Sequence, residues 1–295
     1  MAQDIGWELY RSFLAVLNEG SLSGAARSLG VAQPTVGRHV ASLEKSLSLA
    51  LFTRSQIGLM PTEAALSLRI YAESMQSTVA ALERAAASQG AGVRGTVRIT
   101  ASDIIGVEVL PPIIALLRDQ HPDLTVELVL TDRVQDLLRR ESDIAVRMLR
   151  PRQELLVARR LGQIEIGLYA HQRYIARHGA PVNIADLAKH SLIGFDQTTA
   201  FIRSAGKALS GWRRETFAMR TDNNLAQLAL IRSGAGIGAC QAPIARRDDS
   251  MVRILPRQFS LPLETWVTMH ENLRNSPRCR VTFDALVKGL QRHVG

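Results

Sequence analysis

Residues 13–64 read FLAVLNEGSLSGAARSLGVAQPTVGRHVASLEKSLSLALFTRSQIGLMPTEA, and this stretch decides the fold of the N-terminal part of the chain. Apolar residues at helical spacing predict a helix that ends at Gly20, and a second short helix follows. Gly30 supplies the left-handed backbone of a tight turn. A third helix is predicted to begin at Gln33, because Pro34 in its first turn has no N–H to leave unpaired. Two helices joined by a short glycine-containing turn predict a helix-turn-helix.

The polar residues of this motif are of the kinds that contact DNA. The second helix of a helix-turn-helix enters the major groove N-terminus first. Glutamine reads adenine through N6 and N7, and arginine reads guanine through O6 and N7. The start of the preceding helix can hold a phosphate through free N–H groups, and two short strands around Gly58 predict a wing. The candidate DNA-binding residues are Ser21, Ser23, Gln33, Pro34, Thr35, Gly37, Arg38 and Arg54. The alternative interpretation is a three-helix packing module with a solvated Arg38.

A long helix is predicted after the wing, beginning at the N-cap Thr62 and ending near Gln89. Its apolar stripe consists of Leu68, Tyr71, Met75, Val79, Leu82 and Ala86. At 1.5 Å per residue the helix is roughly 40 Å long. A stripe of this length needs a partner, which predicts dimerisation; packing on its own chain is the alternative. Glycines at 90, 92 and 95 predict a hinge.

From residue 96 onwards, predicted strands and helices alternate, which indicates βαβ units and a parallel sheet. Strands are expected at 96–101, 124–131, 144–147, 155–161, 164–170, 192–195, 217–221, 237–241, 252–255 and 265–270. Helices are expected from the end of the first of these strands to about Gln120, and at 134–141, 223–233 and 277–294.

The N-terminal motif resembles the DNA-binding domain of LysR-type transcriptional regulators. The matching residues are Ala25, Ala26, Gln33, Pro34, Arg38, Leu43, Glu44, Leu51, Phe52, Arg54 and Thr62. The family usually has serine where this chain has Ala32 and Gly37, and commonly glycine where it has Ser48. The missing N-cap and the glycine within the helix each cost about 1 kcal/mol. Looser matches at 143–147, at 234–238 and in the last helix extend the resemblance over nearly the whole chain.

The resemblance implies an α+β multidomain protein. Residues 5–62 would form a winged helix-turn-helix, 63–92 a linker and dimerisation helix with its hinge, and 93–295 a two-lobed α/β effector domain like periplasmic binding proteins. Lobe I would comprise 93–161 and 268–295, and lobe II 162–267. The implied partners are a small-molecule effector, a second copy of the chain, with tetramers common in the family, and double-stranded DNA with an inverted-repeat operator. RNA polymerase is a further candidate partner.

Ligands of α/β sheets bind at the carboxyl ends of strands and at helix N-termini. The candidate effector residues are Ser102, Asp103, Thr131, Arg147, Phe195, Gln197, Asn223 and Gln241, with Asp196 and Thr198 in the same loop as Gln197. Ser102 and Thr131 also match the family's ligand-contact positions. For each candidate, a role as a cap, turn or surface residue is the alternative. Asp103 and Asp196 would repel an acidic effector unless a cation or a donor-rich ligand is involved, so the charge of the effector stays open.

Composition and charge limit the remaining classes of function. The 295 residues are 46% hydrophobic and 21% charged, which excludes a disordered or fibrous chain. The net charge is +9, yet residues 1–62 contribute only +1, so the DNA-binding prediction depends on pattern. The first residues lack the pattern of a signal peptide, and two cysteines cannot form a disulfide framework. A reducing cytoplasm is therefore expected.

Other motifs do not predict an enzyme, a metal site or a cofactor. Residues 234–239 fit the pattern G-x-G-x-x-A, but a helix precedes them and a strand follows, which is the reverse of a dinucleotide site. Residues 42–45 fit S-x-x-K but fall at the end of the recognition helix. The histidines show no metal-ligand spacing. The alternatives are a two-lobed solute-binding protein, a redox-sensing regulator using Cys240 and Cys279, and an enzyme on an α/β scaffold.

Overall fold

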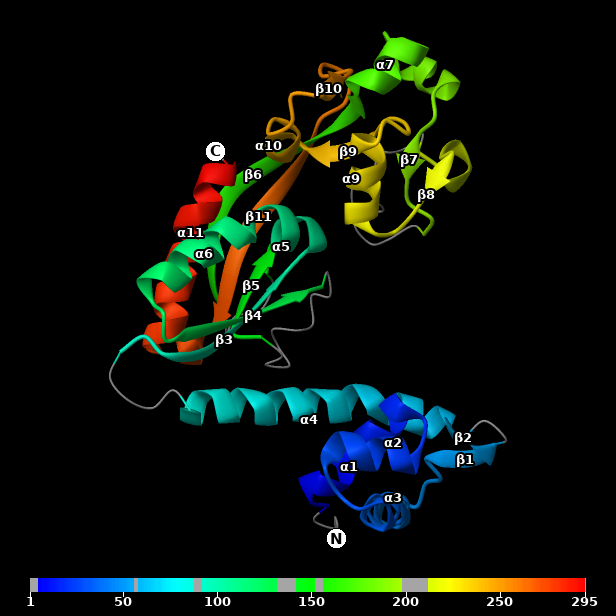
Figure 1. Ribbon diagram of the computed structural model, residues 1–295, viewed down its shortest axis with the longest axis vertical. Helices are drawn as coiled ribbons and strands as arrows, with labels where there is room; N and C mark the ends of the chain where they lie inside the picture. The colour runs from blue at the N-terminus through cyan, green and yellow to red at the C-terminus, as the bar shows by residue number, and fades with distance from the viewer. Residues whose placement is uncertain are drawn as a thin grey trace. The chain divides into compact units, whose positions relative to one another are not determined.

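The computed structural model describes residues 5–55, 58–87, 92–131, 142–151, 156–197 and 212–294 (Figure 1). The chain divides into two compact units, with the boundary between Ala86 and Ala87. The helix predicted at 134–141 and the candidate Thr198 lie outside the described residues. In the part that is described, no helix combines the length and apolarity needed to cross a bilayer.

The N-terminal unit is a helical domain with a two-stranded wing. Its elements are α1 (Trp7–Glu19), α2 (Leu22–Leu29), α3 (Gln33–Leu47), β1 (Phe52–Ser55), β2 (Gly58–Pro61) and α4 (Glu63–Ala87). Gly20 and Gly30 end α1 and α2 in the left-handed conformation, with φ of 65° and 68°. The helix-turn-helix and the wing are therefore where the sequence predicted them.

The apolar face of α3 is buried in the core of this unit. Val36 and Val40 pack with Val16 and two alanines of α2, and Leu43 packs with Phe13 and Leu51. The small alanines let α2 approach its neighbours closely. Each large side chain removed from water stabilises the unit by about 1.5–3 kcal/mol, so the apolar stripe fixes which face of α3 points outward.

The helix α4 begins as predicted. Thr62 Oγ1 accepts the N–H of Ala65 at 3.2 Å and donates to the carbonyl of Ala50 at 2.8 Å. The first turns of α4 are anchored by Ala65 and Ala72, which are buried in the core of the unit. Tyr71, next to Ala72, and Leu82, farther along the helix, remain 67% and 68% exposed in the single chain.

In the C-terminal unit, the described residues form one seven-stranded mixed sheet. Its strands are β3 (Gly95–Ala101), β4 (Leu124–Leu130), β5 (Ile144–Arg147), β6 (Leu156–His171), β9 (Gly238–Gln241), β10 (Met251–Ile254) and β11 (Leu261–His270), in the order β10-β6-β11-β5-β3-β4, with β9 on β6. Within this sheet, the predicted parallel pairing is found between β3 and β4 and between β3 and β5. The other pairings are antiparallel. A separate parallel pair joins β7 (Ile193–Gly194) to β8 (Met219–Arg220).

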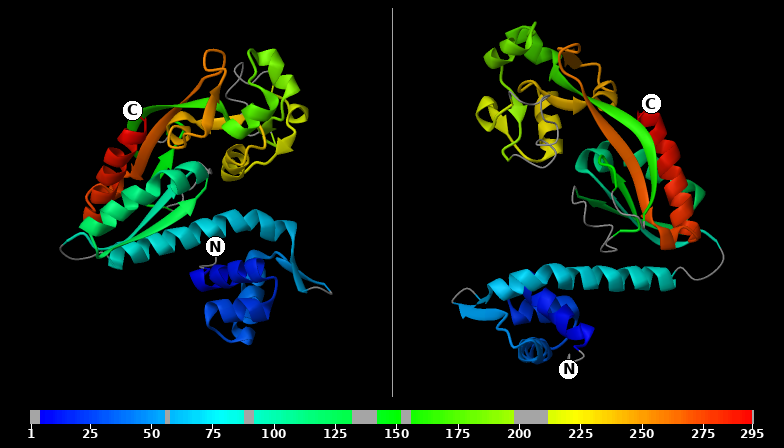
Figure 2. Two further views of the ribbon diagram at one scale, coloured as in Figure 1. Left: turned by 45° about the horizontal axis from the view of Figure 1, so that its top comes forward. Right: turned by 180° about the vertical axis from the view of Figure 1, so that it is seen from behind.

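Two long strands connect the lobes (Figure 2). The strands predicted at 155–161 and 164–170 are one strand, β6, and β11 begins at Leu261 instead of residue 265. Gly162 has a φ of 144°, and the register with β11 shifts opposite it, between Thr265 and Trp266. This glycine therefore bends a continuous strand, where the local sequence had suggested a break. The C-terminal unit is a single compact unit. We use lobe I for its elements before Gly162 on β6 and after Thr265 on β11, and lobe II for its elements in between.

The single helix predicted after β3 is two helices, α5 (Asp103–Glu108) and α6 (Leu110–Gln120), with Val109 outside the helical region at φ −123°. Pro111 and Pro112 lack the N–H groups that a continuous helix would bond to the previous turn. The remaining helices are α7 (Gln172–His178), α9 (Asn224–Arg232), α10 (Ala242–Ala245) and α11 (Pro277–Val294), with short 3₁₀ turns η2 (Ile184–Lys189), η4 (Arg214–Thr216) and η5 (Glu271–Leu273). α11 packs Phe283, Leu286 and Leu290 into the larger hydrophobic core of the C-terminal unit.

Candidate DNA-recognition and effector sites

The N-terminal end of α3 presents polar side chains to solvent. Gln33, Pro34 and Arg38 are exposed, and Thr35 and Gly37 are half-buried. The helix begins at the N-cap Ala32, whose φ of −72° and ψ of 141° are those of a cap although its methyl group cannot accept a hydrogen bond. Because the opposite face of α3 is held in the core, these residues are free to meet an external surface.

Packing does not require the glycine within this helix. A Cβ atom at Gly37 would lie 3.7 Å from Leu22 Cδ1, which is an ordinary van der Waals distance. The neighbouring His39 contacts Ser12 of α1, with 2.8 Å between Nδ1 and Oγ. Gly37 thus leaves the exposed side of α3 without a side chain at this position, and His39 ties α3 to α1.

The start of α2 is capped by a candidate residue. Ser21 Oγ accepts the N–H of Gly24 at 3.1 Å, so this hydroxyl is engaged within the protein. Ser23 is exposed in the first turn of the same helix.

The wing is attached to both sides of the helix-turn-helix. Glu44 Oε1 accepts the N–H groups of Leu51 at 2.7 Å and Phe52 at 3.2 Å. On the other strand, the N–H of Leu59 donates to the carbonyl of Gly20 at 3.0 Å. Arg54 is exposed and pairs with Leu59 in the ladder. The sequence indicated Arg54, but it did not reveal that Glu44 joins the wing to α3.

In lobe I, the predicted effector residues lie around the carboxyl ends of three parallel strands. Ser102 follows β3, and its Oγ is buried without a hydrogen-bond partner among the described residues. The N–H of Thr131, after β4, donates to the carbonyl of Ala101 at 2.9 Å. Arg147 ends β5 and is buried, with its Nη2 donating to Thr100 Oγ1 at 2.7 Å. Arg147 thus holds two strands of lobe I together.

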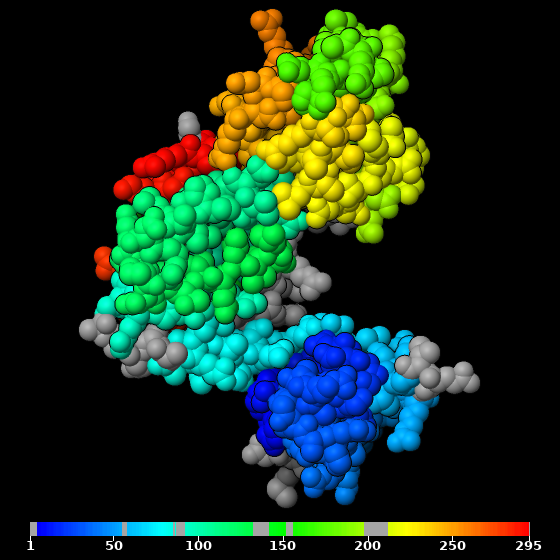
Figure 3. All heavy atoms as spheres, in the orientation of Figure 1, coloured from blue at the N-terminus to red at the C-terminus, as the bar shows by residue number. Residues whose placement is uncertain are grey.

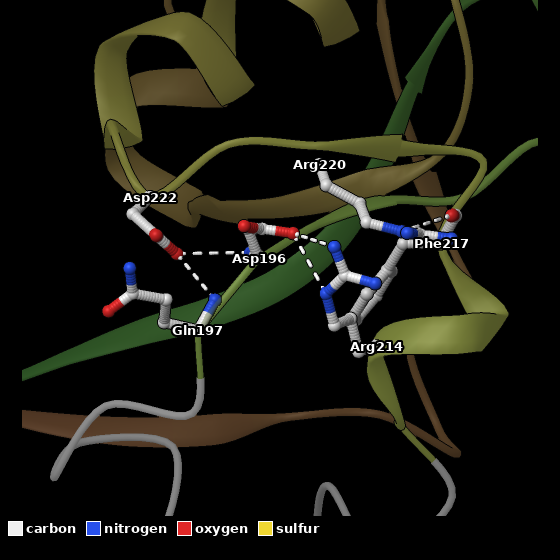
Figure 4. Close-up of polar contacts among 6 residues, drawn as sticks. All are labelled: Asp196, Gln197, Arg214, Phe217, Arg220 and Asp222. Carbon is white, nitrogen blue, oxygen red and sulfur yellow. Dashed lines mark hydrogen bonds and ion pairs between the residues drawn. The ribbon is translucent and has the colours of Figure 1, made fainter.

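In lobe II, the loop after β7 is held by two residues that the sequence did not indicate (Figure 4). Asp222 Oδ1 accepts the N–H groups of Asp196 and Gln197, each at 3.0 Å. Arg214 Nη2 lies 2.7 Å from Asp196 Oδ1. The ion pair offsets the negative charge of Asp196. The Gln197 side chain is exposed, and Phe195 is half-buried.

Two of the predicted residues meet between the lobes. Asn223 Oδ1 caps α9 by accepting the N–H of Ala226 at 2.8 Å, and its Nδ2 donates to Asp103 Oδ2 at 3.4 Å. Gln241 differs from them, because it is buried and its Oε1 lies 3.2 Å from Nε2 of His293 on α11.

Comparison with known families agrees with this arrangement. A family model described as the LysR substrate binding domain matches residues 90–291, and a model described as the bacterial regulatory helix-turn-helix protein, lysR family, matches residues 7–66. The chain belongs to the LysR family of transcriptional regulators. The helix-turn-helix and the two-lobed unit of this LysR-family regulator correspond to the two matched regions.

Relatives and solved structures resemble this LysR-family chain to different extents. An HTH-type transcriptional regulator of Xanthomonas campestris pv. campestris is 32% identical over 181 residues, which cover 60% of this chain and 52% of the relative, so the match spans about half of that protein. The structure of CrgA from Neisseria meningitidis is 24% identical, covers 96% of this chain and 98% of that one, and has a TM-score of 0.60. Full-length CbnR complexed with its target DNA is 20% identical, covers 98% and 99%, and has a TM-score of 0.66. The structural likenesses show a shared fold.

The two thiols of this LysR-family chain lie in the core. Burial raises the pKa of Cys240 to about 12, which keeps the thiol protonated and poorly nucleophilic. Cys279 is fully buried in lobe I. The geometry therefore gives no support to a redox role for Cys240. Among the described residues, no group of three or more His, Cys, Asp or Glu side chains is placed to hold a metal ion.

Proposed function

We propose that this protein is a sequence-specific DNA-binding transcriptional regulator whose activity is modulated by a small-molecule effector bound between the two lobes. The observation that carries the proposal is the N-terminal end of α3, where Gln33 and Arg38 are exposed while Val36, Val40 and Leu43 are buried beneath them. This is the placement that a recognition helix needs to reach base edges. The shared fold with CbnR, which was solved with its target DNA, supports the same interpretation.

The DNA-binding residues are assigned by chemistry. Gln33 and Arg38 would read bases, while Pro34, Thr35 and Gly37 would let the helix approach them closely. Ser23 and the N–H groups at the start of α2 would face a phosphate, with Ser21 shaping that turn as its cap. Arg54 on the wing would contact the backbone or the minor groove. Since residues 1–62 have a net charge of only +1, base contacts would supply much of the discrimination.

The effector would lie at the strand ends that face the other lobe. Ser102 supports this assignment, because its buried hydroxyl has no partner among the described residues and is available to a ligand. The other residues proposed for the effector site are Asp103, Thr131, Arg147, Phe195, Gln197, Asn223 and Gln241. With Asp196 paired to Arg214, that carboxylate no longer weighs against an acidic effector. The effector would shift the balance between lobe arrangements by the difference in its affinity for them.

We further propose that the chain forms a homodimer through α4, and that two such dimers associate into a homotetramer. Exposed apolar side chains along α4 support the dimer. Two recognition helices related by a twofold axis would bind an inverted repeat. RNA polymerase remains a candidate partner. The domains would be 5–62 for DNA, 63–92 for the linker, 93–161 with 268–295 for lobe I, and 162–267 for lobe II.

We place the protein in the cytoplasm and assign it no catalytic activity, because its matched relatives are named as transcriptional regulators.

Selection from a random duplex library with the purified full chain tests the proposed function. The expected result is enrichment of one inverted-repeat sequence. A bound pool as random as the starting library would overturn the proposal.

A further inference from the structure

Polar contacts join lobe I to lobe II at both ends of the α5–α9 pair. In Figure 3 the blue-green surface that includes α5 lies against the yellow surface of α9. The two ends differ in strength: Glu108 and Arg232 meet at the C-terminal end, and Asp103 and Asn223 meet at the N-terminal end.

A bidentate ion pair joins the C-terminal ends of α5 and α9. Arg232 Nη1 lies 2.7 Å from Glu108 Oε1, and Arg232 Nη2 lies 2.9 Å from Glu108 Oε2. This parallel geometry makes the pair stronger and more directional than a single hydrogen bond. The same contact lowers the pKa of Glu108 and raises that of Arg232, so both groups stay charged.

A second arginine continues the connection between the lobes. Arg247 of lobe II donates from Nη1 to the main-chain carbonyl of Glu108 at 2.6 Å, and from Nη2 to His293 Nδ1 at 3.1 Å. With Nδ1 accepting, Nε2 carries the hydrogen of the neutral ring and donates to Gln241 Oε1 at 3.2 Å. His293 lies on α11 of lobe I and Gln241 on β9 of lobe II, and both are buried. Each of these contacts crosses from one lobe to the other.

The N-terminal end is much weaker. Its hydrogen bond from Asn223 Nδ2 to Asp103 Oδ2 is 3.4 Å long and exposed, so water competes with it directly. Asp103 lies about 7.5 Å along α5 from Glu108, at 1.5 Å per residue. A force that separates the lobes would therefore part Asp103 from Asn223 before it parted Glu108 from Arg232.

We propose that Glu108, Arg232, Arg247, His293 and Gln241 form an interlobe brace that acts as the pivot when the lobes open for an effector. Opening separates Asp103 from Asn223 and leaves the brace intact. The lobes then rotate about the brace as rigid bodies, between the closed arrangement seen here and an open one. The functional consequence rests on the proposed effector site, whereas the mechanical claim concerns the free protein.

Distance measurement between two nitroxide labels on the full chain tests this claim. The labels are attached at Leu116→Cys in α6 and Val182→Cys in lobe II, two exposed positions, whereas the native cysteines are buried. Labelled chains are diluted with unlabelled protein so that only distances within one chain contribute. The double variant Arg232→Gln with Arg247→Gln removes the arginine contacts of the brace. Asp103→Ala removes the weak contact with Asn223. Arg98→Gln, which removes an ion pair within lobe I, is the matched control.

The readout is the width of the distance distribution. If the brace is the pivot, the distance distribution should be narrow in the parent, in Arg98→Gln and in Asp103→Ala, whatever the mean distance. It should be broad in the double variant Arg232→Gln with Arg247→Gln. A narrow distribution in the brace variant, or a broad one in Asp103→Ala, overturns the proposal. If the double variant does not fold, Glu108→Gln, which keeps the shape of the side chain, takes its place with the same two outcomes. No DNA or effector is present, so failure here is distinct from failure of the library selection.

Discussion

At the scale of single residues, Ser48 is the departure from the family pattern with the clearest structural consequence. It ends α3 with a φ of 55°, in the left-handed region where glycine is favoured. Ser48→Gly should therefore raise the free energy of unfolding of the N-terminal unit by about 1 kcal/mol. Urea denaturation measures the change. Ser46→Gly within the helix is the control and should destabilise; equal or lower stability for Ser48→Gly would contradict the assignment of strain.

His293 gives a prediction for pH. Burial, followed by the charge of Arg247, lowers the pKa of His293 to about 4 from its ordinary 6.5. Between these values the unfolded chain binds the proton and the folded chain does not, so stability should fall as the pH falls from 6.5 towards 4. The pKa of His190 is also lowered by burial and contributes in this range.

Melting temperatures from pH 7.5 to 4.5 measure the effect. His293→Gln should show a smaller decrease with falling pH than the parent, while His190→Gln, the matched variant in lobe II, should retain the share due to His293. An identical pH dependence in His293→Gln and the parent would show that the His293 ring is not the source.

Local roles of residues could be predicted from the sequence, and long-range roles could not. Gly20 and Pro34 act on their own helix ends, so the order of the residues is enough to assign them. Glu44 and Asp222 accept backbone N–H groups from other elements, and nothing in the neighbouring sequence identifies those donors.

At the scale of elements, the wing depends on Glu44. Glu44→Ala should leave the N–H groups of Leu51 and Phe52 without their acceptor and destabilise the N-terminal unit by about 1.5–3 kcal/mol, the range for hydrogen bonds to a charged group. Glu44→Gln keeps an acceptor oxygen and should lose less. Hydrogen exchange at Leu51 and Phe52 should accelerate in the order parent, Gln, Ala; unchanged exchange in Glu44→Ala would rule out this role.

The dimerisation prediction belongs to α4. Tyr71→Glu with Leu82→Glu should weaken self-association by more than about tenfold, since each buried apolar side chain contributes about 1.5–3 kcal/mol. Sedimentation equilibrium measures the dissociation constant. Gln76→Glu, at another exposed position of α4, serves as the control for added charge. Unaltered association of the double variant would place the dimer interface elsewhere.

Helices were easier to predict than strand pairing. The predicted start of α3 and both predicted bounds of α11 agree with the structure, because apolar periodicity and caps are local signals. The two predicted strands that are one strand, β6, show the limit: Gly162 permits either a turn or a bend, and pairing with β11 decides between them. The mixed sheet has the same origin, since antiparallel pairing of β6 with β11 is a non-local choice.

At the scale of the whole chain, the sequence predicted where the chain crosses between the lobes but not which polar contacts hold the lobes together. The residues of the Glu108–Arg232 ion pair are 124 positions apart, and each resembles an ordinary surface charge when read alone. Of the candidate effector residues, Asp103 and Asn223 contact one another, whereas Gln241 contacts α11. The roles of these residues in effector binding stay predictions.

Methylation protection on the selected DNA sequence tests the central claim most directly, because dimethyl sulfate modifies N7 of guanine in the major groove, where arginine binds. The parent should protect guanines in two half-sites about one helical turn apart, or a multiple of that. Arg38→Ala should lose the guanine protection and about 1–3 kcal/mol of specific binding, while Arg11→Ala, on the exposed side of α1, should keep both. Identical guanine protection by the parent and Arg38→Ala would contradict the account.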